Sequence, residues 1–295
     1  MKRVVLIVNP HASAVTEERT AAVERVLGRV AEVPTLRTER PRHATELAQA
    51  AGDVDALIVF SGDGGFNEAL NGVDRSDLPL GFVPGGGTSV LPRSLGLPRD
   101  PVRAAERLAD ALDDGRTRVI STGRVNGRRF AFNAGLGIDA EAVRRIDERG
   151  RSAEGRRPGD AAFVGAFVRL VAERRGRFDP VLEIRGCGRA AFLLVANVHP
   201  YSYVKALAIR TTPDATLDDG LDFFAPVRVR PWSLPRLVLF LFTGRGRPEA
   251  LRGHDLDRIE VVCDVPTALQ VDGEDLGDVT EAVFEAERRA ITVLV

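Results

Sequence analysis

Apolar and polar residues alternate in two different rhythms along the chain. In the first part, short apolar runs such as 3–8 and 56–60 are separated by stretches with helical spacing. This alternation predicts parallel strands joined by helices, which form an open sheet covered on both faces. The predicted strands are 3–8, 33–37, 56–60 and 79–83, and the predicted helices are 16–32, 43–51, 66–73 and 101–113. The sequence therefore indicates an N-terminal, doubly wound α/β domain over residues 1–117.

From about residue 118 the pattern changes to short runs of β-forming residues. The predicted strands are 118–122, 128–133, 181–185, 191–198, 206–211, 221–226, 259–262, 267–271 and 290–295. Many short strands separated by turn residues are typical of an antiparallel sandwich or barrel. Helical insertions are expected at 139–177 and 231–252, with a flexible loop at 150–159. We therefore expect a C-terminal antiparallel β-sandwich domain over residues 118–295.

Length and composition limit the classes of function. The 295 residues are 44% hydrophobic, which is enough for a sizeable core, and the net charge of −1 gives no field that favours nucleic acid. Cys187 and Cys263 lie in strand-like segments without metal-ligand spacing, as expected for reduced thiols in a cytoplasmic protein. The chain starts with a predicted strand rather than a signal peptide, and the apolar run 237–242 is far shorter than the roughly 20 residues that cross a bilayer. Any membrane contact is expected to be peripheral, at the inner face.

The most informative segment is 61–72, Ser-Gly-Asp-Gly-Gly-Phe-Asn-Glu-Ala-Leu-Asn-Gly, which follows a predicted strand and leads into a predicted helix. Its glycines can take positive φ and let an anion approach bare backbone N–H groups, while the helix N-terminus adds positive potential. A phosphate would repel Asp63 unless a cation lay between them, so we expect Asp63 to hold Mg²⁺, directly or through water. The alternative is an ordinary strand-to-helix turn with a solvated aspartate.

Two further loops, 9–13 and 84–89, also follow predicted strands. Ligands of open parallel sheets bind beyond the carboxyl ends of the strands, so three such loops favour a nucleotide site over a chance turn. The chain has no P-loop motif, and its only lysines are Lys2 and Lys205. The predicted nucleotide-binding residues are Asn9, Pro10, His11, Ala12, Ser13, Thr38, Ser61, Gly62, Asp63, Gly64, Gly65, Phe66, Asn67, Gly86, Gly87 and Thr88.

Two acidic turns of the second half are candidates for chemistry. In Asp272-Gly273-Glu274, one carboxylate could accept the proton of an attacking hydroxyl while the other orients it or contacts a metal. The segment 214–222 offers hard oxygen ligands on a tight turn, which suit Mg²⁺ or Ca²⁺. For both segments, a plain Asp-Gly hairpin turn is the alternative.

Residues 61–68 resemble the Gly-Gly-Asp-Gly-Thr-x-Asn-Glu signature of the diacylglycerol kinase catalytic domain family, which sphingosine kinases, NAD kinases and, more distantly, phosphofructokinases share. Residues 133–140 and 214–222 resemble further segments of the lipid-kinase branch, so the resemblance covers nearly the whole chain. It implies a first domain like that of NAD kinase or phosphofructokinase, ATP and Mg²⁺ as cofactors, and a diacylglycerol-like or sphingoid lipid alcohol as substrate.

The resemblance also implies roles for the acidic turns. Glu274 would be the proton acceptor, closely coupled to Asp272, and Asp63 would belong to the catalytic group. A structural Mg²⁺ would be bound by the carboxylate of Asp219 and by the backbone carbonyls of Thr216 and Leu221.

The chain departs from the family pattern at several places. Gly65 stands where the signature has threonine, and Val90 and Ser121 stand where two aspartates of the Mg²⁺–water network are expected. Their loss could slow phosphoryl transfer severely, so a catalytically weak or inactive nucleotide- or lipid-binding member is the second hypothesis. An NAD kinase-like enzyme for a soluble substrate is the third, disfavoured by Asn9-Pro10 and by the motif at 218–220.

The sequence also offers two candidate surfaces. Residues 144–177 contain ten arginines and five acids, interleaved with apolar residues at helical spacing. Such a stretch could rest on an anionic membrane. The pattern favours instead a helix whose polar face is solvated and whose apolar stripe covers the core. Trp232 and Phe240 are expected to pack a helix against the sandwich. The identity of the lipid and the formation of a homodimer are left open.

Overall fold

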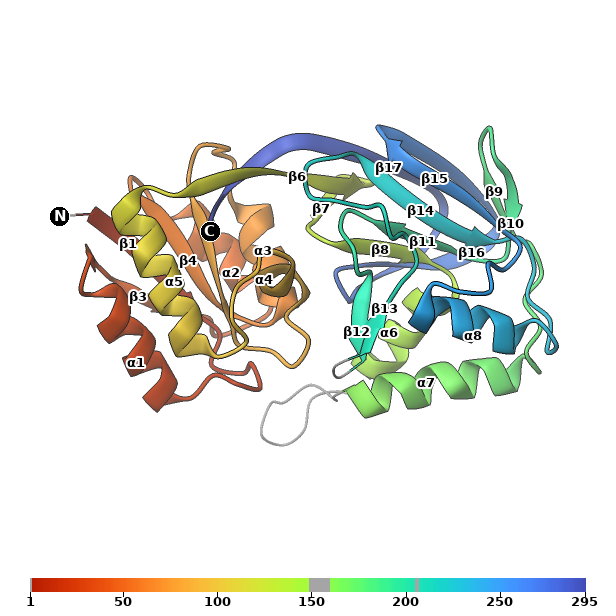
Figure 1. Ribbon diagram of the computed structural model, residues 1–295, viewed down its shortest axis with the longest axis horizontal. Helices are drawn as coiled ribbons and strands as arrows, with labels where there is room; N and C mark the ends of the chain where they lie inside the picture. Colours follow the sequence, from red (N-terminus) through yellow and green to blue (C-terminus); the bar gives the residue numbers. More distant parts are fainter. Residues whose placement is uncertain (1, 149–159, 205–206) are drawn as a thin grey trace. The chain divides into compact units, whose positions relative to one another are not determined.

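The computed structural model describes residues 2–148, 160–204 and 207–295, and its contacts divide the chain into two compact units (Figure 1). Unit 1 comprises Met1–Ile120 and Arg289–Val295, and unit 2 comprises Ser121–Arg288. The C-terminal segment was expected in the second domain. It belongs to unit 1 because Val293 of β17 (Glu274–Leu294) pairs in parallel with Leu80 of β5. The predicted loop at 150–159 lies outside the described residues.

Unit 1 contains a parallel sheet with helices on both faces. Its strands are β5 (Leu80–Pro84), β4 (Ala56–Ser61) and β1 (Lys2–Val8), in this order, with β2 (Ala31–Glu32) and β3 (Thr35–Arg37) both paired to β1. Its helices are α1 (Glu17–Leu27), α2 (His43–Gln49), α3 (Asp63–Gly72), α4 (Val90–Ser94) and α5 (Pro101–Asp114). Val83 packs in the same cluster as residues of α1 and α5, whereas its neighbour Phe82 meets Phe66 of α3. Because successive side chains of a strand point to opposite faces, α1 and α5 cover one face and α3 the other.

Unit 2 is built mainly from antiparallel strands. Its main ladder runs β15 (Ala250–Leu256), β14 (Leu221–Pro226), β11 (Leu193–Ala196), β8 (Asn133–Leu136), β16 (Arg258–Val271) and β17. Shorter strands pair as β6 (Thr117–Val125) with β7 (Arg128–Phe130), β9 (Leu182–Ile184) with β10 (Gly188–Ala190), and β12 (Ser202–Val204) with β13 (Leu207–Ile209). The helices are α6 (Ile138–Glu148), α7 (Asp160–Glu173) and α8 (Leu234–Thr243). The chain thus has parallel strands in its first part and antiparallel strands in its second, as the sequence predicts.

Two local predictions for unit 2 are wrong. The helix expected over 231–252 is only α8, because Gly244 ends it with a left-handed backbone (φ 70°) and the residues from Ala250 onward form β15. Trp232 does not pack against the strands, since it is 78% exposed. The prediction for Phe240 is confirmed: its ring is buried and stacks on Phe224 with centroids 5.0 Å apart.

The helices are short relative to a bilayer. Within the described part of the chain, no helix is both long enough and apolar enough to cross a membrane.

Candidate functional site

Three loops of unit 1 are joined at the carboxyl ends of β1, β4 and β5. The backbone N–H of Asn9 donates to the carbonyl of Phe60 (3.0 Å). The N–H of Gly85 donates to Ser61 (2.6 Å), and the N–H of Ala14 donates back to Gly85 (2.8 Å). The loops at 9–13, 61–65 and 84–89 therefore meet, as the sequence predicts.

Glycine is required where two of these loops touch. A Cβ atom added to Gly86 would lie 2.9 Å from the Cα of Gly62, and one added to Gly85 would lie 2.9 Å from the carbonyl oxygen of Ser61. Neither contact leaves room for a side chain. These glycines let the backbones after β4 and β5 approach each other, which fixes the shape of the site.

The glycines of 61–65 do not take positive φ, contrary to the prediction. α3 begins at Asp63, so Gly64 and Gly65 lie in its first turn, and Gly62 precedes the helix with an extended backbone (φ −88°, ψ −178°). A Cβ on Gly64 would meet nothing within 4 Å, and the same holds for Gly87 in the next loop. Within the part of the chain that the structure describes, the N–H groups of Gly64 and Gly65 donate to no acceptor. This open first turn can bind an anion such as a phosphate.

Gly65 is required for a separate reason. A Cβ at this position would lie 2.1 Å from the hydroxyl oxygen of Ser61. Ser61 is 1% exposed, and its hydroxyl has no hydrogen-bond partner among the residues described. The side chain of Ser61 therefore fills the space that a side chain at position 65 would need, and it keeps a hydroxyl beside the first turn of α3.

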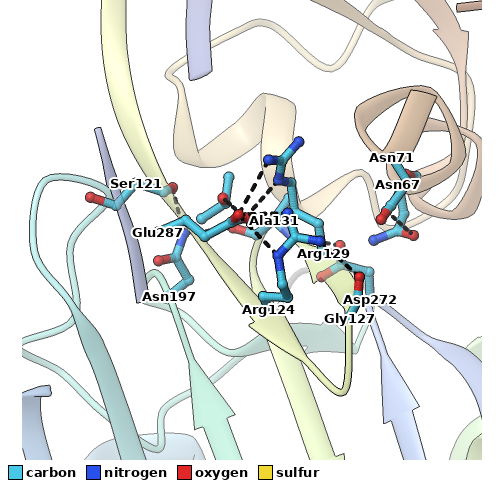
Figure 2. Close-up of polar contacts among 11 residues, drawn as sticks. Asn67, Asn71, Ser121, Arg124, Gly127, Arg129, Ala131, Asn197, Asp272 and Glu287 are labelled. Atoms are coloured by element: carbon cyan, nitrogen blue, oxygen red, sulfur yellow. Dashed lines mark hydrogen bonds and ion pairs between the residues drawn. The ribbon is translucent and has the colours of Figure 1, made fainter. Parts of the chain in front are cut away.

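The polar residues of α3 hold neighbouring segments of unit 1. Asp63 accepts a hydrogen bond from the N–H of Val90 (Oδ1–N 2.8 Å), the first residue of α4. Glu68 accepts from the N–H of Ala44 in α2 (3.3 Å). Asn67 is fully buried and accepts from the side-chain amide of Asn71 (Figure 2).

The remaining predicted nucleotide residues lie at different depths. The ring of Phe66 is buried against Phe82 (centroids 5.2 Å apart), so it belongs to the core. Thr38 is also buried, and its N–H donates to Val8 at the end of β1 (2.9 Å). Exposed or half-buried positions are taken by Asn9, Pro10, His11, Ala12, Ser13, Gly86, Gly87 and Thr88.

In unit 2, Asp272 and Gly273 form the two-residue turn between β16 and β17. Both take positive φ (47° and 79°), and the flanking Val271 and Glu274 pair with each other. The segment is thus a tight hairpin turn of the kind that Asp-Gly favours. This geometry matches the alternative interpretation of the sequence, but the two carboxylates still have distinct surroundings.

The carboxylate of Asp272 is fully used in hydrogen bonds to the backbone of its own unit. Its carboxylate is 3% exposed and accepts three backbone N–H groups, from Ala131 (2.7 Å), Phe132 (3.0 Å) and Asn133 (3.1 Å). Figure 2 shows Asp272 beside Ala131. The carboxylate therefore fixes the segment that connects β7 to β8.

Glu274 keeps an accessible oxygen. Its Oε2 forms an ion pair with Arg128 (2.8 Å), and its side chain is 31% exposed. Its Oε1 accepts no hydrogen bond from any residue that the structure describes. Of the two acids, Glu274 is the one with a carboxylate oxygen that no described residue contacts.

A network of buried polar groups supports this turn. The side-chain oxygen of Gln270 accepts from the N–H of Gly273 (2.9 Å), while its amide donates to Asp139 (2.7 Å). Tyr201 also donates to Asp139 (2.7 Å). Burial raises the pKa of Asp139 above its ordinary value, although both hydrogen bonds oppose the shift.

Sequence reasoning missed an arginine cluster on β6 and β7. Arg124 and Arg129 both bind Glu287 (each 2.6 Å), as Figure 2 shows. Thr122 donates to the same carboxylate (3.1 Å). Burial raises the pKa of Glu287, but the hydrogen bonds from Arg129 and Arg124 lower it by more. The net pKa is below its ordinary value, so the group stays ionised. The available signal was the pair Arg128-Arg129, directly after the turn-forming Asn126-Gly127.

Comparison with known proteins decides the family. Residues 3–125 match the diacylglycerol kinase catalytic domain. A diacylglycerol kinase of Bacillus subtilis is 34% identical over 230 residues, which cover 75% of this chain and 72% of that protein.

The chain belongs to the diacylglycerol kinase catalytic domain family.

Other relatives of this family member match over shorter segments. A diacylglycerol kinase of Mycobacterium tuberculosis is 38% identical over 104 residues, which cover 34% of this chain and 32% of that protein. A relative from Streptococcus pneumoniae is 30% identical over 155 residues, and the chain spans about half of its length (51%). A crystal structure of a diacylglycerol kinase from Bacillus anthracis has the same fold, with a TM-score of 0.73 at 21% identity, and the match covers 99% of this chain and 96% of that one.

Two positions of this family member lack an aspartate that the resemblance leads one to expect. Val90 is buried, and its backbone N–H is the group that binds Asp63. Ser121 is buried as well, and its backbone is held by the carbonyl of Leu217 (2.7 Å) and by the amide of Asn197 (2.9 Å; Figure 2). At both positions the contacts described are made by the backbone, and they do not require an acidic side chain.

The predicted structural Mg²⁺ loop contains one close polar pair. Thr216 donates to the carboxylate of Asp219 (2.5 Å), and the N–H of Asp219 donates to the carbonyl of Thr216 (3.3 Å). Leu221 is buried at the start of β14. Among the described residues, no three His, Cys, Asp or Glu side chains converge as a metal centre. Magnesium at this loop would therefore need carbonyl and water ligands around a single carboxylate, and the site stays a prediction.

Proposed function

We propose that this family member is an ATP-dependent lipid kinase, which transfers the γ-phosphoryl group of ATP to a hydroxyl of a diacylglycerol-like or sphingoid lipid. The observation that carries the proposal is the set of joined loops in unit 1, where the N–H groups of Gly64 and Gly65 are open. The Bacillus subtilis relative is named a diacylglycerol kinase, which supports the substrate class. In this proposal, the protein is cytoplasmic and acts at a membrane surface.

Unit 1 would bind the triphosphate through backbone groups rather than through a lysine. The first turn of α3 offers two unpaired N–H groups and the positive end of a helix, which fit a polyphosphate. Asp63 would support the Mg²⁺ that accompanies ATP, directly or through water, and the ion would neutralise phosphate charge. Unit 1 would be the NAD kinase- or phosphofructokinase-like nucleotide domain of the proposal.

Unit 2, the β-sandwich domain of the proposal, would supply the base. As the lipid hydroxyl oxygen attacks the γ-phosphorus, the bond from that phosphorus to the β–γ bridging oxygen breaks and ADP leaves. The hydroxyl proton moves to Oε1 of Glu274, the carboxylate oxygen without a partner among the described residues. Asp272 and Gln270 would act as positioning residues, because their hydrogen bonds fix the turn that carries Glu274.

A second candidate is a nucleotide- or lipid-binding member with little or no activity. The buried, backbone-bound Val90 and Ser121 favour it, because neither can contribute a carboxylate to a Mg²⁺–water network. An NAD kinase-like activity on a soluble substrate has no comparable observation in its favour.

One assay separates these candidates. Purified protein is incubated with ATP labelled at the γ-phosphate, Mg²⁺ and a panel containing diacylglycerols, sphingoid bases and NAD. The proposal predicts a labelled lipid phosphate. Binding of ATP without transfer to any lipid would instead establish the inactive alternative, and labelled NADP would overturn the lipid-kinase proposal.

A further inference from the structure

Helix α8 of unit 2 carries apolar residues on its outer side as well as on its inner side, and Arg236 is its one charged residue. Its inner side is anchored by Leu237 and Phe240, which are 6% and 5% exposed. Its outer side presents Val238, Leu239 and Phe242, which are 47%, 48% and 38% exposed. A helix at the surface of a globular protein normally carries polar residues on its outer side. We therefore expect an apolar partner to cover the outer side of α8.

The outward residues form one continuous surface. Leu239 follows Val238 directly, and Phe242 lies four residues after Val238 and three after Leu239, so the three side chains are neighbours on the helix. We name these three residues the α8 apolar face. Trp232, which is 78% exposed, lies two residues before the start of the helix.

The charges around α8 are mostly positive. Residues 227–249 include five arginines and one acid, Glu249, and two of these arginines, Arg228 and Arg230, pair with Asp179. Arg236, Arg245 and Arg247 are exposed, and neither Arg245 nor Arg247 forms an ion pair with any part of the chain that the structure describes. The flank of the α8 apolar face therefore carries an uncompensated positive charge.

The arginine-rich stretch at 144–177 differs in this respect. Arg144 pairs with Asp275 and Asp278, Arg145 with Glu173, and Arg174 with Glu141. On α7, Leu170 is buried in the core cluster, while Val164 and Val168 are exposed (39% and 60%). The arginines of α6 are therefore neutralised by acids, whereas Arg245 and Arg247 at the end of α8 are not; Arg175, after α7, is also exposed and without an ion pair among the described residues.

We infer that the α8 apolar face, with Arg245 and Arg247, docks into the headgroup layer of a bilayer that contains anionic phospholipids. Apolar side chains would enter the boundary of the acyl chains while the guanidinium groups bind lipid phosphates. The helix is about 15 Å long at 1.5 Å per residue, so it would lie in the interface without crossing it. A second copy of the chain is a poorer partner, because a self-complementary contact would bring Arg245 and Arg247 of both copies together, with Glu249 as the one nearby acid of each copy.

The inference deepens the proposed function, since a lipid kinase must reach a substrate that resides in a membrane. It can nevertheless be tested without catalysis. Trp232 is the only tryptophan of the chain, so its fluorescence reports on this surface alone.

The experiment titrates the full chain with phosphatidylcholine vesicles that contain, or lack, phosphatidylglycerol. We expect a blue shift of Trp232 emission and co-sedimentation with the anionic vesicles only, reduced by salt. A Leu239→Ser/Phe242→Ser double variant should bind these vesicles roughly tenfold more weakly. In Arg245→Gln/Arg247→Gln, the ratio of affinities for anionic and neutral vesicles should fall roughly 30-fold. The control is Val265→Ser, a 54% exposed valine of β16, which should bind like wild type.

Several outcomes would overturn the inference. One is wild-type protein that does not sediment with anionic vesicles at low salt. Another is an α8 variant that binds the vesicles like wild type although its melting curve shows that it is folded. A dimer dissociated by Leu239→Ser in the absence of vesicles would assign the face to a second copy. Turnover of a short-chain diacylglycerol dispersed as monomers separates this result from the proposed function, because the α8 variants should keep that activity.

Discussion

The candidate sites of the two units use different chemical groups: backbone N–H groups in unit 1 and carboxylate side chains in unit 2. In unit 1 the loops are held by backbone hydrogen bonds and glycine contacts, and the groups left open are the N–H groups of Gly64 and Gly65. In unit 2 the turn carries two carboxylates: Asp272 accepts buried backbone N–H groups, and Glu274 pairs with Arg128 and leaves its other oxygen open. Fixed backbone dipoles can bind a phosphate without titrating, whereas accepting a proton requires an ionisable group. In the proposed function, unit 1 would therefore supply nucleotide affinity and unit 2 would supply proton transfer.

The largest expected effect falls on unit 2 chemistry. Glu274→Gln keeps the size of the side chain but cannot accept a proton, so kcat should fall by roughly 10²- to 10⁴-fold with little change in ATP affinity. The two quantities are measured separately, by initial rates and by equilibrium binding. Asp278→Asn, at another half-exposed acid of β17, is the control and should turn over like wild type. Normal turnover by Glu274→Gln would remove Glu274 as the base.

Asp272 should show that the two acids of the turn do different work. Asp272→Ala leaves three buried backbone N–H groups without an acceptor, so the free energy of unfolding should fall by about 3 kcal/mol. Glu274→Gln should cost less than about 1 kcal/mol, since its partly exposed ion pair contributes little stability. Denaturant melts of both variants provide the comparison. Equal stabilities would mean that Asp272 does not hold the β7–β8 segment.

The glycine contacts of unit 1 predict a smaller effect on stability. Gly65→Thr should destabilise the protein by roughly 1–3 kcal/mol, because its Cβ would collide with the hydroxyl of Ser61. Adding Ser61→Gly removes the obstacle, so the double variant should recover most of the loss, a coupling that a double-mutant cycle measures. Additive losses would show that the two positions do not share one space.

The smallest effect concerns a charge of unit 2 away from the turn. The hydrogen bond to Asp222 raises the pKa of His254, so the folded state favours the protonated ring. The resulting stability is fully present below the unfolded pKa of about 6.5 and is lost as the pH rises through the raised value. His254→Gln should therefore lower the melting temperature slightly at pH 6 and not at pH 8, because the His254 ring is 55% exposed and solvent screens its pair with the buried Asp222. An equal loss at both pH values would contradict this linkage.

The parts of the structure that sequence could predict are those governed by local pattern. The apolar run at 56–60 and the glycine turn after it placed β4 and its loop correctly. The start of α3 was placed too late, because Gly64 and Gly65 suggest a turn, and only the contact with Ser61 explains why a helix keeps Gly65. The predicted helix at 231–252 extends into the first three residues of β15, because the polar residues of this strand give no strand pattern and its pairing with β14 is long-range.

The structural role of Asp272 could not be predicted from the local pattern, although the family resemblance singled out Glu274 as the proton acceptor. The acceptor role of Asp272 depends on the N–H of Ala131, which is 141 positions away in the chain. Such long-range pairing leaves no trace in the local pattern.

The most direct test of the central claim is the affinity for ATP of a variant that blocks the open first turn of α3. A Cβ at Gly64 meets nothing within 4 Å, and neither does one at Gly165, an exposed glycine of α7 that serves as a matched control. Both Gly64→Val and Gly165→Val should therefore fold with nearly wild-type stability. The account predicts that Gly64→Val binds ATP roughly tenfold or more weakly in equilibrium dialysis, while Gly165→Val binds it like wild type. Undiminished ATP binding by a folded Gly64→Val protein would contradict the account.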